Sequence, residues 1–122
     1  MNIKTVILTF SVLVLVAPHS AQAISTKREV VCYYFKGSEL KRRDVCKFQD
    51  FDTSSRIIWS DGVKTQIRWV SRYSNTPSLD GVPAREYERD SETLEVIERP
   101  VLNNSVRCLQ ALESDNSVCW SR

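Results

Sequence analysis

The segment from Ser55 to Val70 carries the clearest pattern in the sequence, and it predicts a β-hairpin. From Val63 to Trp69, apolar or hydroxyl side chains alternate with charged or amide side chains. A period of two is typical of a strand that buries one face. The dipeptide Asp61-Gly62, which is common in hairpin turns, separates this strand from the preceding apolar residues. We therefore expect two antiparallel strands joined here by a short turn.

The length of this turn decides which residues pair across the hairpin. A two-residue loop would place Trp59 opposite Lys64, so that apolar and charged side chains share a face. A three-residue loop over Ser60–Gly62 places Trp59 opposite Val63 and gathers the large apolar groups on one face. The hydrophobic pattern therefore predicts the three-residue loop, with Gly62 in the left-handed region of backbone conformation.

The first 23 residues have the features of a secretory signal peptide. Lys4 precedes an apolar run from Val6 to Val16, and Ala21-Gln22-Ala23 matches an A-x-A cleavage site. The apolar run is too short for a stable membrane span. We therefore expect residues 24–122 to form a single domain that is secreted or periplasmic and has no membrane span.

Four cysteines in a short secreted chain predict a disulfide framework. They are Cys32, Cys46, Cys108 and Cys119, and no two of them have the C-x-x-C spacing that is common in zinc sites. We favour the local pairs Cys32–Cys46 and Cys108–Cys119, each joining adjacent strands. A pairing of the two ends of the domain, through Cys32 with Cys108 or Cys119, remains an alternative.

Several other segments favour strands because they are rich in β-branched or aromatic residues, or because they alternate. The charges of Leu40 to Phe48 indicate an edge strand, and Ser105 to Leu112 fits either a short helix or a strand. The fold class that follows is mostly β: a small antiparallel barrel or sandwich, stapled by disulfides, with a short helix near the C-terminus left open. The strand segments are Glu29–Phe35, Leu40–Phe48, Ala84–Asp90, Thr93–Ile97 and Val118–Trp120.

The usual catalytic groups are missing from the predicted mature chain. The only histidine, His19, lies in the signal peptide, so a histidine base or metal ligand is excluded. Oxidised cysteines would offer neither a thiol nucleophile nor a thiolate ligand. No nucleotide-binding or EF-hand motif is found. The formal charge is +2 for the whole chain and +1 without Lys4 of the signal peptide, which argues against nucleic acid as a partner. We therefore predict no enzyme, no metal and no cofactor.

Carboxylates are the groups left for an enzymatic alternative. Glu86 and Glu88 would share one face of a strand, and such a pair can hydrolyse glycans when burial raises one pKa. Their alternation with Arg85 and Arg89 instead favours a surface of paired charges. A carboxylate-dependent hydrolase is therefore the alternative to a binding protein.

Two segments are candidate binding surfaces. The basic cluster Lys41-Arg42-Arg43 could hold an acidic group, although it could equally protect an edge strand. The loop Ser74–Gly81 is the longest run of turn-forming residues, and loops on rigid scaffolds often carry binding sites. The expected partner is a protein or glycan of the cell envelope or exterior. The candidate binding residues are Lys41, Arg43, Ser78, Asp80 and Gly81.

The order of these features is similar to that of the periplasmic inhibitors of c-type lysozyme, which are small secreted β-barrels. The similar features are Cys32 followed by Gly37, the Asp61-Gly62 hairpin, and Ser78–Gly81 before Tyr87. The Ser-Gly-x-Gly-like loop of that family is not reproduced, so we assign no membership. The sequence predicts a non-catalytic binding or interaction module, and the resemblance suggests an inhibitor of an envelope or secreted enzyme. A structural or stress-related envelope protein is a further alternative.

Overall fold

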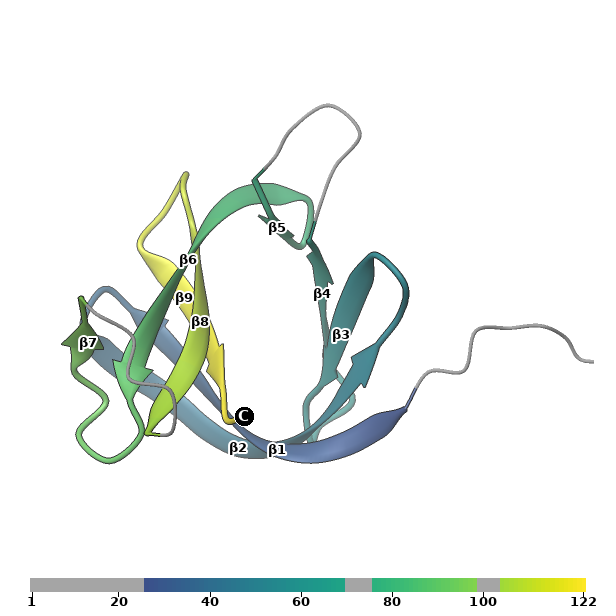
Figure 1. Ribbon diagram of the computed structural model, residues 1–122, viewed down its shortest axis with the longest axis horizontal. Helices are drawn as coiled ribbons and strands as arrows, with labels where there is room; N and C mark the ends of the chain where they lie inside the picture. The colour runs from purple at the N-terminus through teal and green to yellow at the C-terminus, as the bar shows by residue number, and fades with distance from the viewer. Residues whose placement is uncertain (1–25, 70–75, 99–103) are drawn as a thin grey trace, which may run out of the picture.

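The computed structural model describes residues 26–69, 76–98 and 104–122, in which eight strands close into an antiparallel barrel (Figure 1). Each strand pairs with the next strand of the ring, and pairing of β1 with β9 closes it. The ninth strand, β7 (Val96–Ile97), pairs with β6 outside the ring. The ring consists of β1 (Lys27–Lys36), β2 (Glu39–Asp50), β3 (Ser54–Ile58), β4 (Lys64–Arg68), β5 (Ser78–Leu79), β6 (Val82–Asp90), β8 (Ser105–Ala111) and β9 (Asn116–Trp120).

The prediction of a mostly β, disulfide-containing barrel is confirmed, without the optional helix. Residues 105–111 form strand β8, whose inward side chains complete the core, and the described part of the chain contains no helix. It follows that none of the described segments is a helix able to cross a bilayer. The predicted signal peptide, residues 1–23, lies outside the described residues.

The predicted hairpin has the predicted register. Ile57 lies opposite Thr65, and the backbone N–H of Trp59 donates to the carbonyl oxygen of Val63 at 2.8 Å. Gly62 has a φ of 89°, a conformation that a residue without Cβ adopts freely. The three-residue loop is therefore confirmed, and Trp59 is buried as the pattern required.

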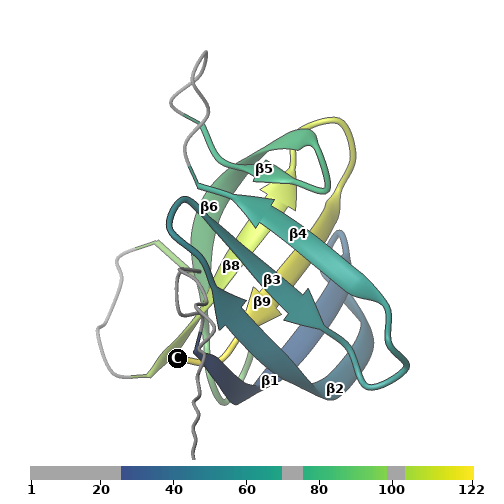
Figure 2. The ribbon, with the colours of Figure 1, turned by 90° about the vertical axis from the view of Figure 1, so that its right-hand side faces the viewer.

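Alternation along the strands fills the interior of the barrel with apolar side chains. Figure 2 shows the barrel from the side, with its strands tilted across one another. The buried residues of this core are Val30, Cys32, Cys46, Phe48, Ile57, Trp59, Ile67, Leu79, Ala84, Leu109, Ala111, Val118 and Trp120.

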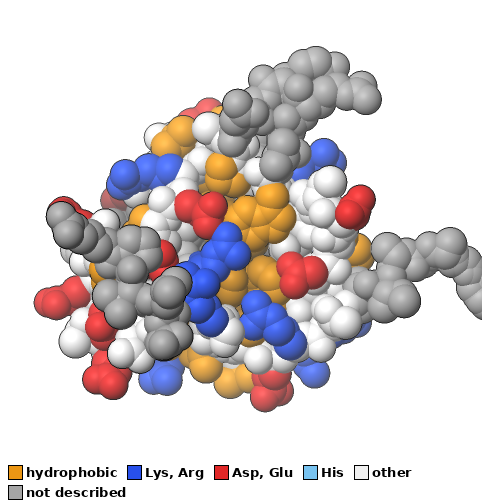
Figure 3. All heavy atoms as spheres, viewed as in Figure 1, with side chains coloured by type: hydrophobic (Ala, Val, Ile, Leu, Met, Phe, Trp, Pro, Cys, Tyr) orange, Lys and Arg blue, Asp and Glu red, His pale blue; other side chains and the backbone are white. Residues whose placement is uncertain are grey.

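Aromatic side chains fill one end of the barrel. Phe48 stacks on Trp120 with 5.3 Å between ring centroids, and Trp69 meets Trp120 edge-on at 6.0 Å. The guanidinium carbon of Arg107 lies 4.7 Å from the ring centre of Trp69 and 5.8 Å from that of Trp120. In the view of Figure 3, hydrophobic side chains occupy the centre of the ring and basic side chains lie across them. We call the side chains of Phe48, Trp69 and Trp120 the aromatic plug.

A second, smaller core lies on the outer face of the barrel. It contains Tyr33 and Phe35 of β1 together with the disulfide Cys108–Cys119, and Arg89 covers it. The guanidinium carbon of Arg89 is 3.8 Å from the ring centre of Phe35. Arg89 is only 6% exposed, so this arginine is part of the packing between the barrel wall and the segment that carries β7.

The prediction that Leu40–Phe48 is an edge strand is wrong. Strand β2 lies between β1 and β3, and a closed ring leaves it no free edge. The charges have another explanation: Lys41, Arg43 and Lys47 are exposed on the outer face, while Cys46 and Phe48 alternate with them into the core.

The cysteines behave differently in the two predicted local pairs. Cys108 and Cys119 lie directly opposite each other on β8 and β9 and form a disulfide of 2.01 Å, which excludes the end-to-end pairings of Cys32. The predicted bond between Cys32 and Cys46 is not formed: both are buried thiols on β1 and β2, and they lie diagonally across the strand pair, with Cys32 opposite Asp44 and Cys46 opposite Val30. Burial raises the pKa of both thiols, and their mutual hydrogen bond raises the pKa of Cys32 further.

Candidate functional site

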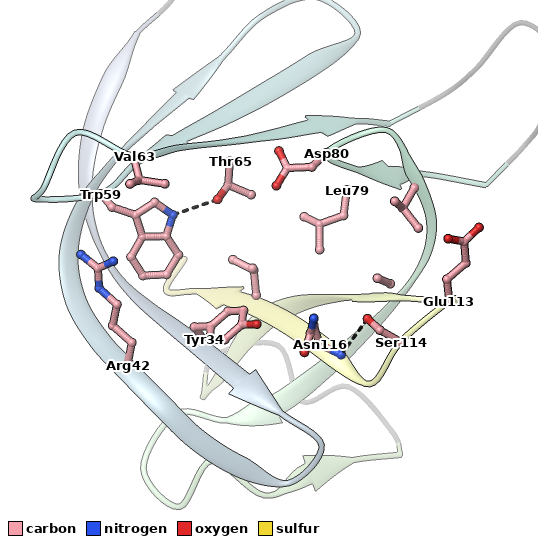
Figure 4. A pocket seen from close by; sticks show the side chains of 13 residues that line it. Tyr34, Arg42, Trp59, Val63, Thr65, Leu79, Asp80, Glu113, Ser114 and Asn116 are labelled. Atoms are coloured by element: carbon pink, nitrogen blue, oxygen red, sulfur yellow. Dashed lines mark hydrogen bonds between the residues drawn. The ribbon is translucent and has the colours of Figure 1, made fainter.

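The end of the barrel away from the aromatic plug opens into a cavity of about 590 Å³, which we call the cup (Figure 4). Its walls come from the ends of the strands and from the connections β3–β4, β5–β6 and β8–β9. The apolar lining residues are Trp59, Val63, Leu79, Val82, Ala111 and Val118. The polar lining residues are Tyr34, Arg42, Thr65, Asp80, Glu113, Ser114 and Asn116.

Trp59 forms a fixed wall of the cup. Its indole Nε1 donates a buried hydrogen bond of 2.9 Å to the Oγ1 of Thr65, which lies across the hairpin. The guanidinium carbon of Arg42 lies 4.8 Å from the indole ring centre, in a cation–π contact. Because Thr65 accepts the hydrogen bond of the indole N–H and Arg42 contacts the ring, the indole has a defined position before any ligand enters.

The positive charge of Arg42 is neutralised within the protein. Its two terminal nitrogens contact Asp44 at 2.8 Å and Asp61 at 3.2 Å. The hydroxyl and backbone N–H of Ser60 also donate to Asp44, and these bonds lower the pKa of Asp44 to about 2. The backbone N–H of Val63 and then Arg42 lower the pKa of Asp61. Both carboxylates are therefore ionised at neutral pH, and Arg42 contributes no uncompensated charge.

Asp80 is held at the rim by a tight turn. Asp80 and Gly81 have φ values of 50° and 84°, as in the two-residue type I′ turns that join β-strands, and here they join β5 to β6. The backbone N–H of Asp80 donates to the carbonyl oxygen of Gln66, and its Oδ1 accepts from the N–H of Gln66, both at 2.8 Å. The carboxylate of Asp80 therefore faces the cup from a fixed backbone.

Glu113 lies on the β8–β9 connection, across the cup from Arg42 (Figure 4). Its side chain is exposed, and within the described residues it has no hydrogen-bond or ion-pair partner. Asp80 likewise has no cationic partner there. The cup thus presents two carboxylates that the described part of the protein leaves without a counter-charge.

The structure does not bring the predicted binding residues into one site. Of these residues, Asp80 alone lines the cup, whereas Ser78 and Gly81 border a separate hollow of about 380 Å³. Lys41 and Arg43 lie on the outer face of β2, where Lys41 pairs with Glu39 at 3.2 Å. The first part of the candidate loop, residues 74–75, lies outside the described residues.

The sequence patterns did not reveal that Tyr34, Trp59 and Glu113 share a cavity. These residues come from β1, the β3–β4 turn and the β8–β9 turn, which closure of the barrel alone brings together. A local signal existed for the β5–β6 turn, because Asp80-Gly81 stands between Leu79 and Val82. The run of turn-forming residues Ser74–Gly81 predicted a long loop that includes this dipeptide, and Pro83 placed the start of the next strand near Ala84. A proline near the start of a strand is nevertheless compatible with a sheet.

Glu86 and Glu88 belong to the opposite end of the barrel, and both are paired. Glu86 contacts Arg107 at 2.6 Å, and Glu88 contacts Arg122 at 2.6 Å and accepts a bond from the hydroxyl of Ser105. The pKa of Glu88 is lowered mainly by the hydrogen bond from the Ser105 hydroxyl and, to a smaller extent, by Arg122. A general acid in glycoside hydrolysis needs a raised pKa, so this arrangement opposes the hydrolase alternative. The described residues also contain no cluster of three or more acidic, cysteine or histidine side chains able to hold a metal.

Comparison with known proteins finds no matching family, no matching curated protein and no matching solved structure. The class of protein therefore follows from the fold itself: an eight-stranded antiparallel barrel with a plugged end and a cup at the other end.

Proposed function

We propose that this protein is a non-catalytic binding module whose ligand site is the cup. The observation that carries the proposal is the cup itself, a concave cavity at the mouth of a small barrel that is lined by both apolar and polar side chains. The mouths of β-barrels are recurrent ligand sites, and a volume of about 590 Å³ lies in the range of pockets for small organic molecules.

The proposed place of action is the periplasm or the cell exterior. The disulfide Cys108–Cys119 supports an oxidising compartment, and the secretory signal predicted in residues 1–23 supports export. The ligand can be a free molecule, or a group carried by a protein or glycan of the envelope, because the cup contacts the group that enters it. Inhibition of an envelope enzyme would be one use of such binding.

Nuclear magnetic resonance with ¹⁵N-labelled protein tests the site. The neutral probes are cyclohexanol and 2-phenylethanol, added up to millimolar concentration. We expect saturable shifts of the Trp59 indole N–H and of the backbone amides of Thr65, Val82 and Val118, which line the cup. The indole N–H of Trp120, in the aromatic plug, is the internal reference and should move less.

Filling the cup should abolish these shifts. Ala111 lines the cup and Ala111→Phe would occupy part of its volume, whereas its neighbour Leu112 is 55% exposed and does not line the cup. We expect Ala111→Phe to prevent saturation and Leu112→Phe to retain it. If Ala111→Phe unfolds the protein, Val82→Phe replaces it. An absence of saturable binding of both probes, or binding that survives in a folded cup-filling variant, would disprove the proposed site.

A further inference from the structure

We propose that the cup selects organic cations: molecules with an apolar body and one ammonium or guanidinium group. This inference rests on the proposed function, because it names the class of ligand that the same cavity takes. It is carried by the distribution of charge around the cup together with the apolar wall.

The charged side chains of the cup are unequally compensated. Arg42 is the only basic residue among the described residues that line it, and Asp44 and Asp61 already contact both of its terminal nitrogens. Asp80 and Glu113 also line the cup but have no cationic partner in the described part of the protein. Among the described residues, the cup and the two partners of Arg42 together carry one positive formal charge and four negative ones. The positive charge is that of Arg42, and the negative charges are those of Asp44, Asp61, Asp80 and Glu113.

The geometry separates the compensated charge from the uncompensated ones. Figure 4 shows Arg42 beside Trp59 on one side of the cup and Glu113 on the opposite side, and Asp80 lies on the β5–β6 turn between them. A carboxylate ligand would therefore find the donors of Arg42 engaged and would be repelled by Asp80 and Glu113. A cationic group would meet those two carboxylates without breaking an existing ion pair.

The apolar part of the ligand has a separate place. Trp59 and Leu79, buried but lining the cup, offer apolar contact beneath the charged rim. Apolar contact area supplies affinity, while complementary charge at the rim supplies discrimination between ligands. The two features together favour a molecule that is amphiphilic and positively charged over one that is only apolar.

Three probes of matched shape isolate the charge. Phenethylamine, 2-phenylethanol and 3-phenylpropanoate share an aromatic ring and a two-carbon chain, and they are cationic, neutral and anionic at neutral pH. We expect the cation to bind about twofold to fivefold more tightly than the alcohol, the range that partly exposed ion pairs contribute, and the anion to bind more weakly than the alcohol. Added salt should shrink the difference between cation and alcohol because it screens exposed charges.

Two conservative variants assign this preference to the carboxylates. Asp80→Asn removes the charge but keeps an oxygen for the N–H of Gln66, and asparagine tolerates the positive φ of this position. Glu113→Gln removes the second charge at an exposed position. The matched control is Glu29→Gln, an exposed carboxylate on β1 outside the cup. We expect each cup variant to weaken the binding of phenethylamine more than that of 2-phenylethanol, and Glu29→Gln to leave the preference for the cation unchanged.

The outcomes separate this inference from the proposed function. If none of the three probes binds, the cup is not a ligand site and both proposals fail. If 2-phenylethanol binds as tightly as phenethylamine, or if the anion binds most tightly, the cup binds ligands but does not select cations. If the preference survives in the Asp80→Asn and Glu113→Gln double variant, the cation is recognised elsewhere and the assignment is wrong.

Discussion

The indole N–H of Trp59 and the hydroxyl of Thr65 form a hydrogen bond of 2.9 Å across the β3–β4 hairpin. Both side chains are almost completely buried, so neither group can exchange this partner for bulk water. The bond joins the predicted hairpin to the cup, because the residues that fix the strand register also fix the aromatic wall of the cavity.

Replacing Thr65 with valine should destabilise the protein although the shape of the side chain is retained. The indole N–H would remain buried without an acceptor, and we expect a loss of about 2 kcal/mol in the free energy of unfolding. Chemical denaturation measures this loss. Thr65→Ser keeps the hydroxyl and serves as the control, with a smaller loss expected. Equal stability of Thr65→Val and the wild type would show that the bond contributes nothing.

Arg89 should be sensitive even to a conservative change. Its guanidinium packs on Phe35 and donates to the hydroxyl of Tyr87 at 3.1 Å and to the carbonyl oxygen of Leu94 at 2.9 Å. Lysine lacks the planar fork, so Arg89→Lys should cost about 2 kcal/mol of unfolding free energy.

The control for Arg89 is Arg85→Lys. Arg85 is exposed and donates only to the side chain of Gln110 among its described contacts. We expect its replacement to change the unfolding free energy by less than about 0.5 kcal/mol. Similar losses in the two lysine variants would contradict the role given to Arg89 in the outer core.

Cys32 and Cys46 should be inert in the folded protein and able to pair when it refolds. Their raised pKa values and burial keep the thiolate scarce and out of reach of reagents. We expect iodoacetamide to modify neither in native protein and both in concentrated guanidinium chloride, as read by mass spectrometry.

Refolding with oxidised glutathione should join the same two thiols. The protein loses two hydrogens while one glutathione disulfide is reduced to two thiols, and the closed loop of about 15 residues should add roughly 3 kcal/mol of stability. Cys46→Ser is the control, because it cannot form the bond. Two alkylatable thiols after oxidative refolding would show that the pair remains reduced.

Asp44 should give the protein a stability that is lost in strong acid. Its folded pKa of about 2 lies below its ordinary value of 3.8. Stability from a lowered carboxyl pKa is present above the ordinary value and is lost as the pH falls through the folded value. Asp44→Asn should therefore unfold more easily than the wild type at neutral pH, and the two should converge only below about pH 2. Asp52→Asn, at an exposed residue, is the control. A difference that persists unchanged in strong acid would refute this role of the Asp44 charge.

The sequence was sufficient for most of the strands and for one register, but it did not predict β5 and did not decide between helix and strand for β8. The hairpin could be predicted because its hydrophobic pattern and its turn dipeptide agree, and a one-residue slip would have exposed Trp59. The strand pair carrying Cys108 and Cys119 could also be expected from the spacing of the two cysteines. These features depend on residues that are close together along the chain.

The cup could not be predicted in the same way. Arg42 reads as one member of a basic cluster, yet the pleat turns it inward while Lys41 and Arg43 face outward. Glu113 and Trp59 line the same cavity only because of a ring of pairings that includes β1 with β9. The hydrophobic pattern specifies the inward face of each strand, but it does not specify which strands meet around a cavity.

The pairing of β1 with β9 also determines when the fold can be completed. Cys32 lies opposite Trp120, so the first and last strands of the ring share one seam. During synthesis β1 has no partner on that side until β9 has been made, and this side of the core stays open to water until then. Contacts this distant along the chain slow folding, because a long loop must close before they form. The barrel can therefore close only when the first and last strands of the ring are both present, and we expect the pairing of β1 with β9 to be a slow step of folding.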